Sequence, residues 1–142
     1  MFKKIVLATD FTPTTDAAID AARDFAVAFG AEIIVVHAVE PLSSEINSDV
    51  ENEASALYNR LQEQAETKGK DLLDSVREAG VKASIRAVIG RRWEAIVKCA
   101  DDVGADLIVM GSKTIHEGEK VYLGSTSHKV FLVSKVPVLV MR

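Results

Sequence analysis

Apolar residues along this chain follow two regular patterns. Four short runs are continuously apolar: Ile5–Ala8, Ile33–Val36, Leu107–Met110 and Val136–Met141. Uninterrupted runs of this length are typical of parallel strands that are covered on both faces of a sheet. Between them, apolar residues recur every three or four positions, which predicts the buried face of an amphipathic helix. The pattern therefore predicts strands that alternate with helices.

Residues that start and stop helices place the first two helices. Thr12 and Pro13 predict an N-cap and a first helical position, and Gly30 predicts the end of that helix. An apolar stripe from Val50 to Val76 predicts one long second helix. Gly69 lies on the same stripe, where it either lets the helix pass close to a neighbour or marks a kink.

A further strand and two further helices complete the pattern. Apolar and polar residues alternate at Ala83–Ile89, as expected for a strand near the edge of a sheet. The stripe from Trp93 to Val103 predicts a third helix, and apolar positions from Val130 predict a fourth. Strands that alternate with helices imply the α/β class. We predict one domain over residues 1–142, a doubly wound sandwich whose five-stranded parallel sheet has helices on both faces.

The stretch Asp106–Val130 carries the clearest chemistry. A buried strand ends at Gly111, and a polar loop of about a dozen residues follows, longer than most strand-to-helix connections. The loop closes at Gly124, and the hydroxyl residues Ser125–Ser127 open the next helix. The free N–H groups and the dipole of a helix N-terminus favour an anion such as phosphate. Simple capping of the helix by a hydroxyl would explain the same residues, and both readings stay open.

Composition and charge narrow the classes of function. The chain has 142 residues and a net charge of −4, with no basic block, which argues against a nucleic-acid or anionic-membrane partner. A single cysteine, Cys99, excludes a disulfide framework and a cysteine metal cluster. The three histidines have no metal-ligand spacing, and no apolar segment is long enough to span a bilayer. A cytoplasmic protein is expected.

Residues spread along the chain match a known pattern. The nucleotide motif Gly-x2-Gly-x9-Gly-Ser/Thr stands here as Gly111, Thr114, Gly124 and Ser125, so three of its four defining positions agree. Further similarities are Asp10 after the first strand, His37-Ala38-Val39 after the second, Val88-Ile89-Gly90 before the third helix and Pro137-Val138-Leu139-Val140 at the end. On these residues the chain resembles the universal stress protein family over essentially its whole length.

The resemblance implies a fold, a ligand and an assembly. The sheet order would be 3-2-1-4-5, and the protein would be a homodimer that binds ATP with Mg²⁺ as a stress-response regulatory or signalling module. No catalytic constellation is evident, so any ATP hydrolysis would be slow. Carried over position by position, the resemblance places Ala8, Thr9 and Asp10 along adenine and ribose, and the backbone of Ala38 at the adenine edge. It places Met110 and Gly111 at the ribose and first phosphate. The phosphates would be held by Gly124, Ser125, Thr126 and Ser127.

The chain departs from the motif at Thr114, where the nucleotide-binding branch has glycine. A β-branched residue is strained if that position needs a positive φ, and its side chain could fill space that the phosphates need. Lys113 brings a positive charge and Thr114 a hydroxyl, both compatible with phosphate. The alternative is therefore the branch of the family that binds no nucleotide and acts as a homodimeric interaction module.

Two other classes are weaker matches. A flavodoxin-like electron carrier is suggested by the hydroxyl-rich segment 9–15, but that segment contains no glycine and the chain has few aromatic residues to sandwich a flavin. A phosphoryl-accepting receiver domain needs an aspartate at the end of the third strand, where Ile89 and Gly90 stand, and a lysine near the end of the last strand, where Met141 stands.

The last strand, Val136–Met141, suggests how copies associate. It is apolar, β-prone and uncharged, and in the order 3-2-1-4-5 it lies at the edge of the sheet. Proteins normally protect such an edge, and a single Pro137 protects it only weakly. A two-fold antiparallel pairing of this strand with its copy would cover both edges, so we predict a homodimer.

Overall fold

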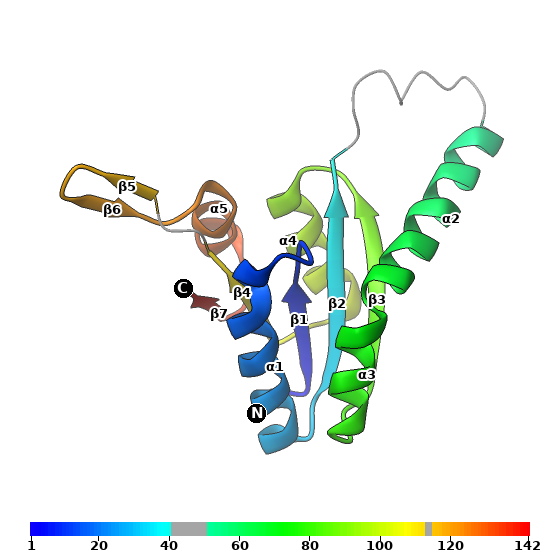
Figure 1. The fold of residues 1–142 in the computed structure, drawn as a ribbon, viewed down its shortest axis with the longest axis horizontal. Helices are drawn as coiled ribbons and strands as arrows, with labels where there is room; N and C mark the ends of the chain where they lie inside the picture. Colours follow the sequence, from blue (N-terminus) through cyan, green and yellow to red (C-terminus); the bar gives the residue numbers. More distant parts are fainter. Residues whose placement is uncertain (41–50, 113–114) are drawn as a thin grey trace.

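The computed structural model describes residues 1–40, 51–112 and 115–142. Two predicted site residues, Lys113 and Thr114, lie outside these ranges. At the centre is a parallel sheet of order β3-β2-β1-β4-β7 (Figure 1). Its strands are β1 (Lys4–Ala8), β2 (Glu32–Val39), β3 (Ala83–Ile89), β4 (Leu107–Gly111) and β7 (Val138–Met141). Because β7 is the fifth strand of this sheet, the predicted order 3-2-1-4-5 is confirmed.

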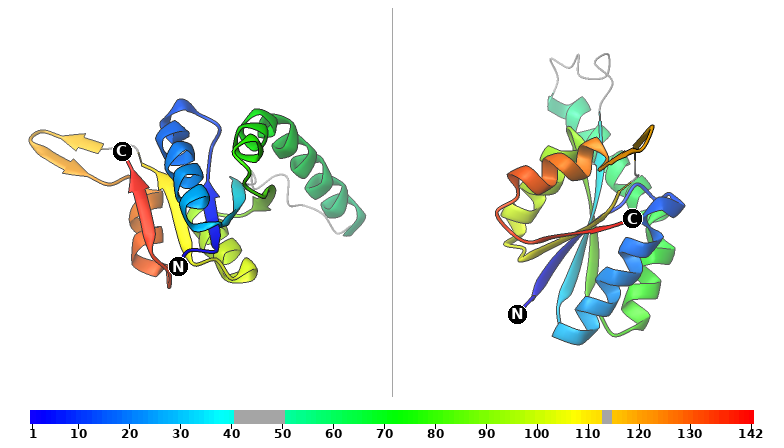
Figure 2. Two further views of the ribbon diagram at one scale, coloured as in Figure 1. Left: turned by 90° about the horizontal axis from the view of Figure 1, so that it is seen from below. Right: turned by 90° about the vertical axis from the view of Figure 1, so that its left-hand side faces the viewer.

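Helices cover both faces of the sheet, as predicted (Figure 2). On one face lie α1 (Asp16–Phe29), preceded by a 3₁₀ turn η1 (Pro13–Thr15), and the pair α2 (Glu51–Lys68) and α3 (Lys70–Glu78). On the other lie α4 (Arg92–Val103) and α5 (Ser125–Val133). Among the described residues, no helix has the length and apolar character needed to cross a membrane.

Side chains of β1 divide the core into two layers. Ile5 and Leu7 point toward the α1 side and pack in one buried cluster with Ala22. Val6 belongs to a second cluster on the opposite face, which includes Ile96 of α4. Because successive side chains of a strand point to opposite faces, a continuously apolar strand fills both layers.

Gly69 separates two helices where the sequence predicts one. The α2 helix ends at Lys68 and α3 begins at Lys70. A Cβ at Gly69 would lie 2.7 Å from Ile85 Cδ1 and 3.0 Å from the Ala65 carbonyl oxygen. The glycine therefore marks both a break in the helix and a close approach to β3, so the two readings left open by the sequence hold together.

A hairpin occupies the stretch predicted as an irregular polar loop. Strands β5 (Ile115–Glu117) and β6 (Lys120–Tyr122) pair antiparallel, and the hairpin projects away from the body of the molecule (Figure 1). Gly118 has a φ of 64° at the turn, a conformation that favours glycine. The sequence prediction missed this hairpin because its residues are mostly polar and lack the apolar alternation of a buried strand.

The β3 edge of the sheet is covered by a side chain. Gln62 of α2 donates from Nε2 to the Ile85 carbonyl oxygen at 2.9 Å, and its Oε1 accepts from the Ala87 N–H at 2.8 Å. The amide thus makes two of the hydrogen bonds that a neighbouring strand would make. The opposite edge is β7.

Replacing Gln62 with alanine is expected to lower the free energy of unfolding by about 1–3 kcal/mol, because the N–H of the buried Ala87 loses its acceptor. Urea denaturation of Gln62→Ala measures the loss. Gln64→Ala, at an exposed position of the same helix, is the matched control. Equal stability of the two variants would show that the amide contributes nothing at this edge.

Candidate functional site

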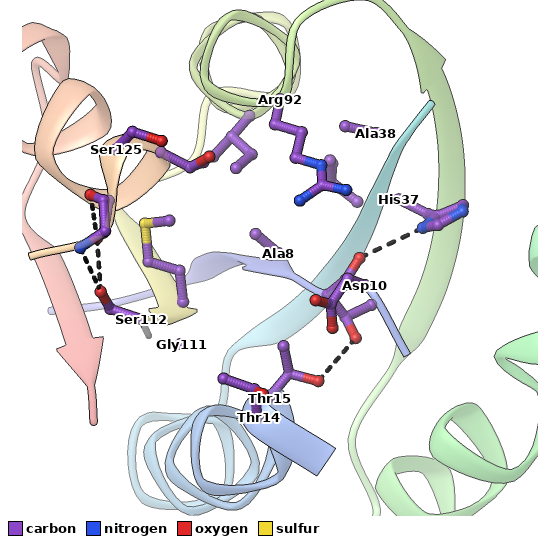
Figure 3. A pocket seen from close by; sticks show the side chains of 17 residues that line it. Ala8, Asp10, Thr14, Thr15, His37, Ala38, Arg92, Gly111, Ser112 and Ser125 are labelled. Atoms are coloured by element: carbon purple, nitrogen blue, oxygen red, sulfur yellow. Dashed lines mark hydrogen bonds between the residues drawn. The ribbon is translucent and has the colours of Figure 1, made fainter. Parts of the chain in front are cut away.

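A cavity of about 430 Å³ opens at the carboxyl ends of β1, β2 and β4 (Figure 3). The central strand β1 lies between β2 and β4, so the connections leave the sheet in opposite directions there, and this is where open α/β sheets bind ligands. The lining residues are Ala8, Thr9, Asp10, Thr14, Thr15, Val36, His37, Ala38, Arg92, Ile96, Met110, Gly111, Ser112, Gly124, Ser125, Thr126 and Ser127.

Thr12 positions the carboxylate of Asp10. Its Oδ1 accepts hydrogen bonds from the Thr12 N–H at 2.9 Å and from Thr12 Oγ1 at 2.5 Å. Partial burial raises the pKa of Asp10, but these hydrogen bonds and the charge of Arg92 outweigh it, so the net pKa lies below the ordinary value. Asp10 is therefore an anionic acceptor at neutral pH, suited to hydroxyl groups of a ligand.

Polar groups in the turn after β1 form hydrogen bonds with one another. Thr9 Oγ1 lies 3.1 Å from Thr15 Oγ1 and accepts from the Phe11 N–H at 3.0 Å. Phe11 has a φ of 61°, an uncommon conformation for a residue with a side chain. The buried Thr9 hydroxyl is thus committed to shaping this turn, although Thr9 lines the cavity as well.

His37 forms one wall of the cavity. Its Nδ1 lies 3.3 Å from the Thr9 carbonyl oxygen, and because a carbonyl only accepts, this nitrogen is the one that carries hydrogen. The Phe11 ring lies 4.7 Å from the imidazole, centroid to centroid. Burial lowers the pKa of His37, and the charges of Lys68 and Arg92 lower it further, against the Thr9 hydrogen bond that raises it. The imidazole is therefore predominantly neutral at pH 7.

Gly111 lies against the backbone of η1. A Cβ at this position would lie 2.8 Å from the Thr14 carbonyl oxygen, closer than real Cβ contacts allow. The missing side chain therefore leaves room for the backbone of η1. Gly111 lines the cavity as well.

A buried pair of serines fixes the start of α5. Ser112 Oγ lies 2.8 Å from Ser127 Oγ and accepts from the Gly124 N–H at 3.2 Å, while Ser127 Oγ donates to the Gly124 carbonyl oxygen at 3.0 Å. The Ser127 hydroxyl is therefore engaged in the structure, and the first-turn groups of Ser125 and Thr126 are those that remain at the cavity. Together with the helix dipole they favour an anion.

The structure brings ten of the predicted site residues to this one cavity: Ala8, Thr9, Asp10, Ala38, Met110, Gly111, Gly124, Ser125, Thr126 and Ser127. Lys113 and Thr114 lie outside the described residues. Sequence reasoning missed Arg92, whose side chain extends from the start of α4 across the cavity (Figure 3). The available signal was a basic pair, Arg91 and Arg92, directly after the strand that ends at Ile89.

Comparison with known proteins agrees with this architecture. The family model described as the universal stress protein family matches residues 1–142. The chain belongs to the universal stress protein family. Universal stress protein MJ0577 of Methanocaldococcus jannaschii is 30% identical over 155 residues, covering 100% of this chain and 96% of that protein. A universal stress protein of Thermus aquaticus is 37% identical over 143 residues, covering all of both proteins.

Solved structures of the family superpose over nearly the whole chain. The structure of hypothetical protein MJ0577 has a TM-score of 0.78 at 35% identity and covers 99% of this chain and 96% of its own. A universal stress protein in complex with cAMP has a TM-score of 0.68 at 27% identity, with 99% and 97% covered.

The lowered pKa of His37 predicts a pH effect on stability. Because the unfolded chain takes up this proton near the ordinary pKa of 6.5 and the folded protein only at lower pH, the free energy of unfolding should fall as pH drops below 6.5. In His37→Gln that dependence should be shallower between pH 6.5 and about 5. Urea denaturation at several pH values measures it, with His128→Gln, an exposed histidine outside the cavity, as control. Parallel curves for wild type and His37→Gln would contradict the prediction.

Proposed function

We propose that this universal stress protein binds ATP, with Mg²⁺ accompanying the triphosphate, as a regulatory or signalling module of the stress response. The observation that carries the proposal is one cavity with apolar walls at one end and a helix N-terminus at the other. A nucleotide has the same division, since its base is flat and largely apolar on its faces and its phosphates are anionic.

The lining residues match the parts of an adenine nucleotide. Val36 and Ile96 supply apolar surface for the base, and the backbone of Ala38, which lines the same cavity, supplies hydrogen-bonding groups for its edge. Met110 and Gly111 lie at the ribose and the first phosphate. The Asp10 carboxylate suits ribose hydroxyls. At the far end, the first turn of α5 suits the phosphates.

The relative solved with cAMP supports the class of ligand. That protein is 27% identical and its complex contains an adenine nucleotide. The likeness extends over 99% of this chain, so it includes every strand end that forms the cavity here.

The groups around the cavity favour binding over catalysis. Its ionisable side chains, among the described residues, are Asp10, His37 and Arg92. The Asp10 carboxylate already accepts two hydrogen bonds from Thr12. With hydrogen on Nδ1, the basic nitrogen of His37 is Nε2, and His37 lies across the cavity from Ser125, where we propose that the phosphates bind (Figure 3). A general base must reach the proton that it removes, so we infer at most slow hydrolysis of ATP. The alternative function, a homodimeric interaction module without nucleotide, follows if Thr114 closes the phosphate site.

Two substitutions test the phosphate end. Ser125→Ala should weaken ATP binding about tenfold, because it removes a hydrogen bond to a charged group. Thr114→Gly should tighten binding if that position requires glycine. Isothermal titration calorimetry with ATP and Mg²⁺ measures both, and Ser84→Ala, an exposed serine on β3, is the control. Binding by none of the proteins at millimolar ATP, with no nucleotide in the purified protein by mass spectrometry, would favour the alternative function.

We further propose that the protein is a homodimer through β7. This strand is the sheet edge opposite to the one covered by Gln62. Apolar side chains nearby on α5 are exposed: Phe131, Leu132 and Val133. An apolar edge flanked by exposed apolar residues is suited to pairing with a second copy.

A lysine at β7 should separate the copies, because two-fold pairing places like charges close together. Light scattering at micromolar concentration should give a dimer mass for the wild type and a monomer mass for Val138→Lys or Val140→Lys. Ile89→Lys, at the exposed end of the β3 edge, is the matched control and should stay dimeric. Circular dichroism checks that each variant is folded. A monomeric wild type would contradict the proposal.

A further inference from the structure

A second, smaller cavity adjoins the first. Its volume is about 230 Å³, and it is lined by Glu40, Arg91, Arg92, Trp93, Ser125, Thr126 and Lys129. Arg92, Ser125 and Thr126 line both cavities. A ligand that reaches the first turn of α5 in the main cavity is therefore at the entrance of this side pocket.

The side pocket is positively charged. Arg91, Arg92 and Lys129 bring three positive charges and Glu40 one negative charge, in a chain whose net charge is −4. The Glu40 carboxylate accepts from the backbone N–H of Arg92 at 3.3 Å. Arg91 lies 3.9 Å from Glu94, and both side chains are mostly exposed, so this pair leaves the arginine available for a stronger anion.

Two helices begin at this pocket. The first residue of α4 is Arg92 and the first of α5 is Ser125, and both line it. The N–H of Arg92 at the start of α4 already donates to the Glu40 carboxylate, whereas no side chain caps the start of α5. The positive end of the α5 dipole therefore adds to the three basic side chains.

The Trp93 ring lies in the side pocket, beside one of its basic side chains. Lys129 Nζ lies 5.5 Å from the centroid of the Trp93 ring, a cation–π distance. The indole Nε1 is buried and has no hydrogen-bond partner among the described residues. Trp93 is also the only tryptophan in the sequence, so its fluorescence reports on the side pocket.

We propose that the side pocket binds the terminal phosphates of the nucleotide and selects a nucleoside triphosphate over a monophosphate or a cyclic nucleotide. The inference rests on the proposed binding of ATP and adds the side chains that distinguish a triphosphate from a monophosphate. A single phosphate is satisfied by the first turn of α5 and by Arg92, the one cation that lines the main cavity among the described residues. Further phosphates add negative charge, and the nearest described positive charges beyond Arg92 along this wall are Arg91 and Lys129.

The double variant Arg91→Gln with Lys129→Gln tests this inference. Calorimetry at fixed ionic strength should show about tenfold weaker binding of ATP with Mg²⁺, because charge-assisted hydrogen bonds to phosphate are lost. Binding of AMP should change by less than about twofold, since its phosphate stays at α5. The control is Lys82→Gln with Lys70→Gln, which makes the same change in net charge at exposed positions outside both cavities.

Tryptophan fluorescence gives an independent readout. ATP should shift the emission of Trp93 in the wild type, and AMP should not. An equal loss of ATP affinity in the double variant and its control, or an unchanged preference for ATP over AMP in the double variant, would overturn the inference while leaving nucleotide binding in place. Absence of binding by both nucleotides in the wild type would instead overturn the proposed function, and this inference with it.

Discussion

The buried hydrogen bonds among Ser112, Gly124 and Ser127 hold the cavity together. They join the end of β4 to the start of α5 across a projecting hairpin. They fix the first turn of α5 at the end of β4, while Val130, buried in the second core cluster, anchors the rest of the helix. Two small hydroxyl side chains thus help to set the separation between the part of the cavity suited to a base and the part suited to phosphate.

Much of the fold could be predicted from the sequence because burial on both faces leaves a strong pattern. The apolar runs at Ile5–Ala8 and Leu107–Met110 follow from strands that contact two layers of helices. The order of the strands came from the family resemblance, since periodicity does not say which strand lies beside which. The cavity residues at the strand ends were likewise named from the family resemblance; the topology adds that the carboxyl ends of parallel strands meet at one end of the sheet.

The features that the sequence did not reveal depend on contacts between distant residues. The basic pair Arg91 and Arg92 is visible in the sequence, but whether Arg92 lines the cavity depends on how α4 packs against the sheet. The missing side chain of Gly111 leaves room for the Thr14 carbonyl oxygen, which comes from a different part of the chain. The hairpin β5–β6 lacks a buried face, so the rule that finds buried strands does not find it.

The covering of β3 by Gln62 has a consequence for how many copies can join. A sheet with two open edges can pair with another copy at each of them. Each added copy then presents a new open edge, and the assembly grows as a fibre. Because the Gln62 amide already occupies the Ile85 carbonyl oxygen and the Ala87 N–H, pairing at the middle of β3 is blocked and β7 is the edge left for it. Two copies paired through β7 would then leave no second open edge. One glutamine on a neighbouring helix therefore stops the assembly from growing beyond two copies.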